Sequence, residues 1–214
     1  MKQLVKGRAT ETSKVRIHND LANAAFFYKN IIEEKRKNGG PGISIDCMAC
    51  ATMLAFTWEA YLNFFGSELL RPDWNEMEKL DVKETLVLGK LSIKADWGKQ
   101  PYSSVRLLTK IRDWLAHGKP VERVITKAVV KGVEKVTGRN IDLSGEWKSL
   151  CTPVLVLKAH DNLDIIFRQM LEASGIAVID TLSSGEGSIT FTETVVVGKP
   201  REPEIKLRTL AEKS

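Results

Sequence analysis

The sequence predicts an all-α fold, a helical bundle followed by a flexible C-terminal tail, and three observations support this prediction. Apolar residues recur three and four positions apart in 17–37 and 153–173, the pattern of helices with one buried face. Residues 47–65 carry a single charge, as in the central helix of a bundle. Glycine and proline follow these stretches, where they favour the ends of helices.

The composition is that of a soluble globular protein that folds without cross-links. Of 214 residues, 43% are hydrophobic and 28% are charged, and a chain of this length can bury a sizeable core without disulfides or metal. Three cysteines do not make a disulfide framework and favour a reducing compartment. Residues 1–20 lack the apolar core of a secretory signal, so we expect a cytoplasmic protein. The net charge of +5 favours a polyanionic partner only weakly.

The first expected helix covers residues 17–37. Residues 1–16 before it are polar, and we expect a disordered N-terminal segment there. Asn19 or Asp20 is the candidate N-cap, because a short side chain with an oxygen can accept a bond from the first turn. The glycines and the proline of residues 37–42 end the helix.

The second expected helix covers residues 44–66, with Ser44 or Asp46 as its cap. The only charge between positions 47 and 65 is Glu59. This length is near the minimum for a membrane span. However, Glu59 and several polar residues interrupt the stretch, so a central bundle helix is favoured and no membrane association is expected. A carboxylate inside such a helix needs a partner.

Two shorter helices follow in the sequence. One is expected over residues 75–88, with Asp73 as its cap. The other opens at Ser103, carries apolar residues at helical spacing, and ends at Gly118.

Residues 119–139 form a basic segment whose pattern fits two conformations. Cations recur at every fourth residue, which is typical of an amphipathic helix with a basic face. The many valines and Gly132 favour a hairpin or an extended arm instead. The cations are Lys119, Arg123, Lys127, Lys131, Lys135 and Arg139.

The last expected helix begins at Thr152, with Pro153 in its first turn, and closes before Gly175. Residues 188–197 have the composition of a strand, but a lone strand has nothing to pair with, so a mobile tail or a partner-binding segment is expected. The predicted organisation is an N-terminal segment 1–16, a helical domain 17–175 and a C-terminal tail 176–214.

Arg112, Asp113 and His117 lie in an otherwise apolar stretch just before Gly118, and two explanations compete. In the structural one, a histidine in the last turn interacts favourably with the helix dipole and the glycine ends the helix. In the chemical one, Asp113 orients the imidazole four residues later and Arg112 binds a phosphate. Arg112 and His117 are about 140° apart around an ideal helix, so one phosphate reaches both more easily if a second copy supplies one of them.

Other motifs give no sign of a cofactor or a metal. Cys47 and Cys50 share one helix face, but no second pair completes a zinc site, so both are expected to be small buried residues. His18 and His160 are isolated and are expected at the surface. The sequence lacks a P-loop, a dinucleotide glycine fingerprint and a G-x-S-x-G motif. No cofactor and no metal are therefore expected.

Three segments resemble the HEPN superfamily. RDWLAHG (112–118) is similar to its signature, an arginine and a histidine separated by four to six residues with a polar residue after the arginine. LAFTWEAYLNFFG (54–66) resembles the long second helix of many prokaryotic members. EWKSLCTP and the apolar helix after it (146–173) are similar to the closing helix of some members. The resemblance covers residues 17–175.

The resemblance implies an up-and-down bundle of four to five helices that forms a homodimer. Many HEPN proteins are metal-independent endoribonucleases of toxin–antitoxin, phage-defence and RNA-processing systems, in which the arginine and the histidine of two protomers line a composite cleft. For this chain it implies RNA and a cognate antitoxin protein as partners, with Arg112, Asp113 and His117 as catalytic residues. Other members are non-catalytic and bind RNA or protein, which is the alternative function. The family often has asparagine or histidine after the arginine, so Asp113 is a less cationic choice.

An enzyme of this kind needs no metal-bound water, because RNA carries its own nucleophile, the 2′-OH. His117 would act as general base or acid, and Arg112 would donate a forked pair of hydrogen bonds to the phosphate. Glu59 would hydrogen-bond Arg112 and fix its direction, or would have a structural partner elsewhere in the core. The RNA backbone would be held by Lys119, Arg123, Lys127 and Lys131.

Overall fold

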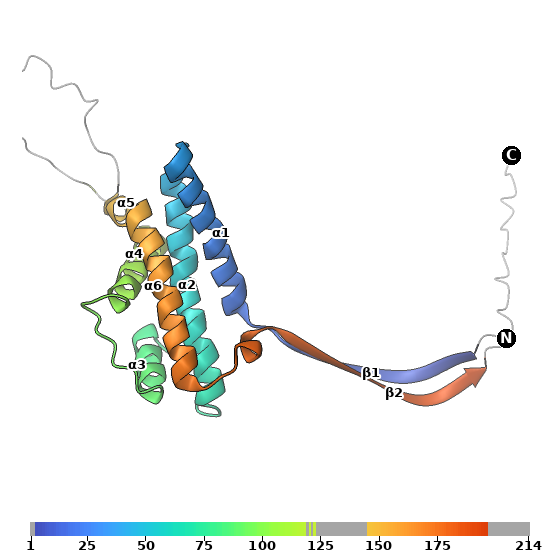
Figure 1. The fold of residues 1–214 in the computed structure, drawn as a ribbon. Helices are drawn as coiled ribbons and strands as arrows, with labels where there is room; N and C mark the ends of the chain where they lie inside the picture. Colours follow the sequence, from blue (N-terminus) through green and yellow to red (C-terminus); the bar gives the residue numbers. More distant parts are fainter. Residues whose placement is uncertain (1–2, 119, 121, 123–144, 197–214) are drawn as a thin grey trace, which may run out of the picture. The chain divides into compact units, whose positions relative to one another are not determined.

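The structure is a computed structural model, and it describes residues 3–118, 120, 122 and 145–196. The chain divides into two compact units. One unit, Arg16–Leu182, is helical, and we call it the helical unit. The other contains a strand from each end of the chain, and we call this pair of strands the ribbon (Figure 1).

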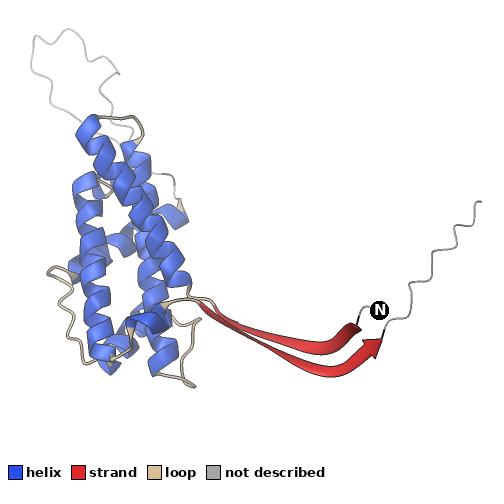
Figure 2. Cartoon of the chain, turned by 45° about the vertical axis from the view of Figure 1, so that its right-hand side comes forward, coloured by secondary structure: helices blue, strands red, loops and turns tan. Residues whose placement is uncertain are grey.

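The prediction of a mainly helical protein is confirmed (Figure 2). Each helix predicted within the described residues is present, with shifts at the ends. The helices are α1 (Ile17–Asn38), α2 (Ile43–Leu69), α3 (Leu80–Lys90), α4 (Tyr102–His117), α5 (Glu146–Leu150) and α6 (Pro153–Ser174), and a 3-10 helix η2 covers Val178–Thr181.

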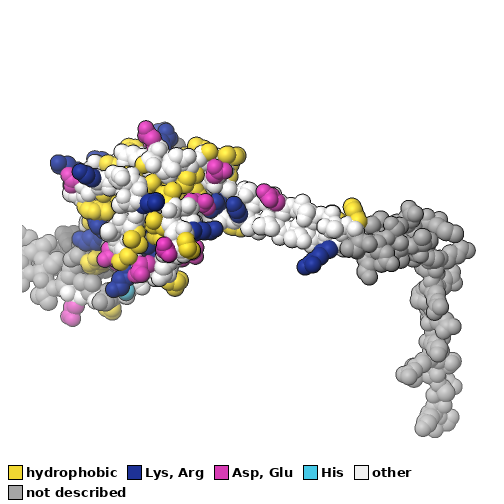
Figure 3. Space-filling model, turned by 90° about the horizontal axis from the view of Figure 1, so that it is seen from below, with side chains coloured by type: hydrophobic (Ala, Val, Ile, Leu, Met, Phe, Trp, Pro, Cys, Tyr) yellow, Lys and Arg dark blue, Asp and Glu magenta, His cyan; other side chains and the backbone are white. Residues whose placement is uncertain are grey.

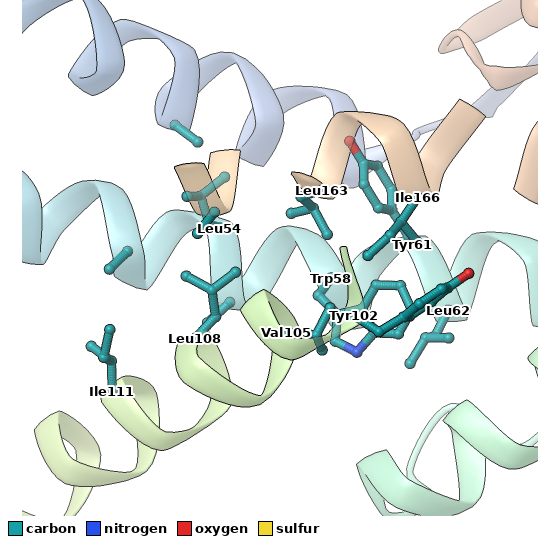
Figure 4. Close-up of a cluster of buried hydrophobic side chains, with 14 of the residues drawn as sticks. Leu54, Trp58, Tyr61, Leu62, Tyr102, Val105, Leu108, Ile111, Leu163 and Ile166 are labelled. Atoms are coloured by element: carbon teal, nitrogen blue, oxygen red, sulfur yellow. The ribbon is translucent and has the colours of Figure 1, made fainter. Parts of the chain in front are cut away.

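Helix α2 is the central element of the helical unit. It packs against α1, α3, α4 and α6, which explains why its sequence is apolar nearly all round. Figure 4 shows side chains of α2, α4 and α6 converging on one core, including Trp58, Leu108 and Ile166. Among the described residues, no helix has both the length and the apolarity that a membrane crossing requires.

Cap residues were predicted less well than the helices themselves. The side chain of Thr152 accepts from the backbone N–H of Leu155 at 3.4 Å, as expected for the start of α6. Asn19 is not the cap of α1, because that helix begins at Ile17 and the Asn19 side chain donates to the Thr181 carbonyl at 2.7 Å. The N-cap of α2 is Gly42, with φ 78°, whereas Ser44 and Asp46 were expected.

Helix α3 begins five residues later than expected. The predicted start at residue 75 lies in a turn, where the Asn75 side chain accepts from the backbone N–H of Met77 at 3.0 Å. Such a local bond competes with the helical one and favours the turn. The basic segment 119–139 lies outside the described residues apart from 120 and 122.

The ribbon corrects the all-α prediction and both terminal predictions. Residues 3–14, expected to be disordered, form β1 (Gln3–Lys14), and the expected mobile tail contains β2 (Ser184–Val196). The two strands pair antiparallel along their length, with one irregularity between Lys6 and Gly7. The strand composition of the tail was recognised, but its partner lies at the other end of the chain.

His18 is buried, which corrects the expectation that it lies at the surface. The residue is 2% exposed, and its ring packs among the rings of Tyr61, Phe64 and Phe167. Burial, with the positive charge of Arg16, lowers the pKa of His18 to about 4, although Asp20 opposes this shift. The fold therefore requires the neutral imidazole.

We expect this burial to make the helical unit sensitive to acid. Because the folded pKa of His18 lies below the unfolded value of 6.5, its contribution to stability is complete above pH 6.5 and is lost as pH falls toward 4. The loss should be on the order of 3 kcal/mol. Urea unfolding at several pH values should show it in the wild type, and His18→Phe should have a flatter profile. Equal pH slopes in the two proteins would contradict the assignment.

Two helical glycines provide a matched test of packing. A Cβ on Gly66 in α2 would lie 2.4 Å from ring atoms of Trp74, whereas a Cβ on Gly89 in α3 would meet nothing within 4 Å. Gly66→Ala should therefore lower the free energy of unfolding by about 1–3 kcal/mol through overpacking. Gly89→Ala should raise it by about 0.5–1 kcal/mol through helix propensity. Chemical denaturation of both variants measures the difference, and effects of the same sign would contradict the packing of Trp74.

Candidate functional site

Helix α4 positions the three residues of the predicted motif near its C-terminal end. The helix ends at His117, and Gly118 adopts the left-handed conformation with φ 47° and ψ 34°. The backbone N–H of Gly118 donates to the Trp114 carbonyl at 3.2 Å and closes the last turn. The predicted helix end at this glycine is therefore confirmed.

Arg112 is held by two carboxylates. Its Nη1 donates to Oε2 of Glu59 on α2 at 3.3 Å, which is the hydrogen bond that the sequence suggested for this pair. Its Nε and Nη2 donate to Oδ1 of Asp113 at 3.1 and 2.9 Å. The guanidinium is thus oriented by one residue of its own helix and one of the central helix.

Sequence reasoning missed Lys83, the second cation at Glu59. Lys83 lies on α3, its side chain is 2% exposed, and its Nζ donates to Oε1 of Glu59 at 2.9 Å. Glu59 therefore joins cations from α3 and α4, one through each carboxylate oxygen. The available signal was spacing, because Lys83 lies three residues after Leu80 and four before Val87, on the buried face of α3.

A second buried carboxylate lies beside this ion-pair network. Glu84 on α3 accepts from Nε1 of Trp58 at 2.9 Å and pairs with Nη1 of Arg106 at 3.1 Å. Burial raises the pKa of Glu84, while its bonds to Trp58 and Arg106 oppose that shift. The guanidinium of Arg106 also lies 3.9 Å from the ring centre of Trp97. These contacts join α2, α3 and α4 next to the candidate site and fix their relative positions.

His117 is exposed, and the structure does not join it to Asp113. The Asp113 carboxylate binds Arg112 instead, which corrects the prediction that it orients the imidazole. The Arg112 guanidinium on the neighbouring residue donates two charge-assisted hydrogen bonds to one carboxylate oxygen and so holds the carboxylate. Within one chain, Arg112 turns toward Glu59 while His117 faces outward.

The predicted RNA-binding cations belong to the basic segment 119–139. Lys119, Arg123, Lys127 and Lys131 lie outside the described residues. On the face of the helical unit drawn in Figure 3, basic and acidic side chains are interspersed with apolar ones. The described residues of that face therefore present no surface of a single charge.

Both cysteines of the Cys47-x-x-Cys50 pair are fully buried, as predicted. Burial raises the pKa of Cys47 to about 11 and that of Cys50 to about 12, so both are uncharged thiols at neutral pH. Among the described residues, no group of three or more histidine, cysteine, aspartate or glutamate side chains is placed to hold a metal ion.

Comparison of the chain with protein-family models, with curated proteins and with solved structures gives no match.

Proposed function

We propose that this protein is a HEPN-like, metal-independent endoribonuclease that cleaves RNA as a homodimer. The observation that carries the proposal is the orientation of Arg112, which Glu59 and Asp113 fix near the end of the helix that also bears the exposed His117. An oriented guanidinium and an exposed imidazole are the two groups that phosphate binding and proton transfer at an RNA backbone require.

The guanidinium keeps donors for a substrate. It has five N–H groups, and the bonds to Glu59 and Asp113 use one each on Nε, Nη1 and Nη2. One N–H therefore remains on each terminal nitrogen. Two parallel donors match two oxygens of a phosphate, and they are most effective where charge develops in the transition state.

Proton transfer is assigned to His117. Its imidazole would take the proton of the 2′-OH as that oxygen attacks the neighbouring phosphorus, or would protonate the leaving 5′-oxygen. The products are a 2′,3′-cyclic phosphate and a 5′-hydroxyl, and no water or metal enters this step. Because Arg112 and His117 are directed to different sides of α4, the complete site uses Arg112 of one copy and His117 of a second.

The setting that we propose is cytoplasmic, in toxin–antitoxin or defence systems, with a cognate antitoxin protein as a further partner. This part of the proposal follows the HEPN resemblance of residues 112–118 and 54–66. Lys119, Arg123, Lys127 and Lys131 would hold the RNA backbone, with an affinity that falls as salt rises.

A non-catalytic dimeric module that binds RNA or protein is the second candidate. One observation favours it: two carboxylates, Glu59 and Asp113, surround Arg112 and oppose the approach of a phosphate. In that function the same residues would set affinity and would not affect any cleavage rate.

Cleavage of a mixed RNA pool tests the two functions against each other. The purified wild type, free of other proteins, should cut RNA in the presence of EDTA and leave ends that carry a cyclic phosphate. Intact RNA after long incubation would reject the enzyme in favour of the binding module. Cleavage that stops on chelation would also reject the proposed mechanism.

A further inference from the structure

The ribbon has two faces of different character. Directly opposite pairs place Phe191 beside Gly7 and Ile189 beside Ala9, so one face is apolar at these two pairs, and Glu11 opposite Gly187 follows on the same face. Phe191 and Ile189 are both about two-thirds exposed, at 68% and 64%. The Phe191 ring lies against Gly7, where a Cβ would come within 3.3 Å of it. The opposite pair on the other face, Arg8 and Thr190, is polar.

The ribbon also has two open edges. It is a two-stranded sheet, so the outer backbone groups of both strands have no strand partner among the described residues. An isolated pair of strands is only marginally stable in water, and further strands on an apolar face are the usual way in which such a pair is stabilised. A long exposed edge is a template for the addition of another strand.

The two edges differ in how well they would accept a strand. Opposite Ser184–Phe191, β1 carries Arg8, Glu11 and Lys14, and charged side chains on an edge strand oppose pairing. In β2, Glu186 is the only charge between Ser184 and Phe191, and Ile189, Thr190 and Phe191 strongly favour a strand. The β2 edge is therefore the one suited to pairing.

The sequence of β2 is also self-complementary, so that two copies of the strand can pair with each other. In an antiparallel pairing of two copies about a two-fold axis at Thr190, Ile189 of each copy lies opposite Phe191 of the other. Directly opposite aromatic and β-branched side chains are a favourable cross-strand pair. The two apolar pairs then continue the apolar face of both ribbons, and Glu186 of one copy does not lie opposite Glu186 of the other.

From these observations we propose that β2 is a homodimerisation edge. Two ribbons join through their β2 strands, in the order β1–β2–β2–β1, and make one four-stranded antiparallel sheet. The partner is a second copy of this chain, because the β2 strand is self-complementary about Thr190. The ribbon is a separate unit from the helices that bear Arg112 and His117, so this contact does not depend on the proposed nuclease.

Cysteine cross-linking of the full-length protein tests the proposed edge. Thr190→Cys places a thiol on the two-fold axis, and the matched control Arg8→Cys places one directly opposite in the same ribbon but on β1. The native Cys47, Cys50 and Cys151 are buried, which keeps the background low. Mild oxidation should produce covalent dimer about ten-fold or more faster from Thr190→Cys than from Arg8→Cys. A disulfide needs Cα atoms within roughly 7 Å, and the proposed contact brings only the two copies of residue 190 that close.

The oligomeric state provides a second measurement. The double variant Ile189→Lys with Phe191→Lys should weaken the dimer about ten-fold or more in sedimentation experiments, because each copy would place cations at the paired edge. The control, Thr10→Lys with Thr12→Lys, carries the same charges on β1 and should dimerise like the wild type. Equal cross-linking from both strands, or an unchanged dimer in the β2 variant, would overturn the proposal, whether or not the protein cleaves RNA.

Discussion

Replacement of Glu59 by alanine is expected to lower the free energy of unfolding by about 3 kcal/mol. The Lys83 ammonium is almost fully buried, and Glu59 is its partner at 2.9 Å. Removal of one member of a buried pair leaves the other charge without compensation, which typically costs about 3–5 kcal/mol. The lower end of this range applies because about one-third of the Glu59 side chain, 32%, is exposed.

Three further variants separate this effect from the loss of an ordinary ion pair: Asp161→Ala, Lys83→Met, and Lys83→Met combined with Glu59→Ala. Asp161→Ala removes the ion pair between Lys29 and Asp161. The N–O distance of this pair is also short, at 2.8 Å, but its carboxylate is exposed, so its loss should cost less than about 1 kcal/mol. In a Lys83→Met background, Glu59→Ala should cost much less than in the wild type, because no buried ammonium remains. Urea denaturation of the wild type and the four variants gives these values. A Glu59→Ala loss as small as that of Asp161→Ala would show that Lys83 is hydrated.

The helices could be predicted because their signals are local. Spacing of apolar residues located α1, α2, α4 and α6 to within a few residues of their ends. The ribbon could not be predicted in this way, because the partner of β2 lies at the other end of the chain. Pairing of strands across that separation leaves no pattern within either strand, so β2 was recognised as a strand and then left without a partner.

The candidate site was predictable where burial forced a contact. A single carboxylate in an apolar helix needs a cation, and Arg112 on the neighbouring helix supplies one to Glu59. The expected contact between Asp113 and His117 was wrong. A spacing of four residues places the two side chains on one helix face, but it does not determine whether Asp113 binds His117 or Arg112. Lys83 was overlooked because a lysine in a short helix near the surface is usually solvated.

The largest expected effect on activity concerns His117. If the protein cleaves RNA, His117→Ala removes the proton-transfer group of the motif and should lower the rate by about 10²- to 10⁴-fold. Arg112→Lys keeps the charge but loses the planar pair of donors, so it should also lower the rate. The control is Lys110→Ala, which removes an exposed cation of the same helix and should leave the rate near that of the wild type. Persistence of full activity in His117→Ala would reject the assignment.

Mixing the two impaired proteins tests the composite site directly. In a mixed dimer, the His117→Ala copy still supplies Arg112 and the Arg112→Lys copy still supplies His117, so one of the two sites is intact. Random exchange of equal amounts makes about half of the dimers mixed, and activity should recover to about one-quarter of the wild-type value. If each site were built within one chain, no dimer would contain an intact site, and the mixture would be as inactive as its components.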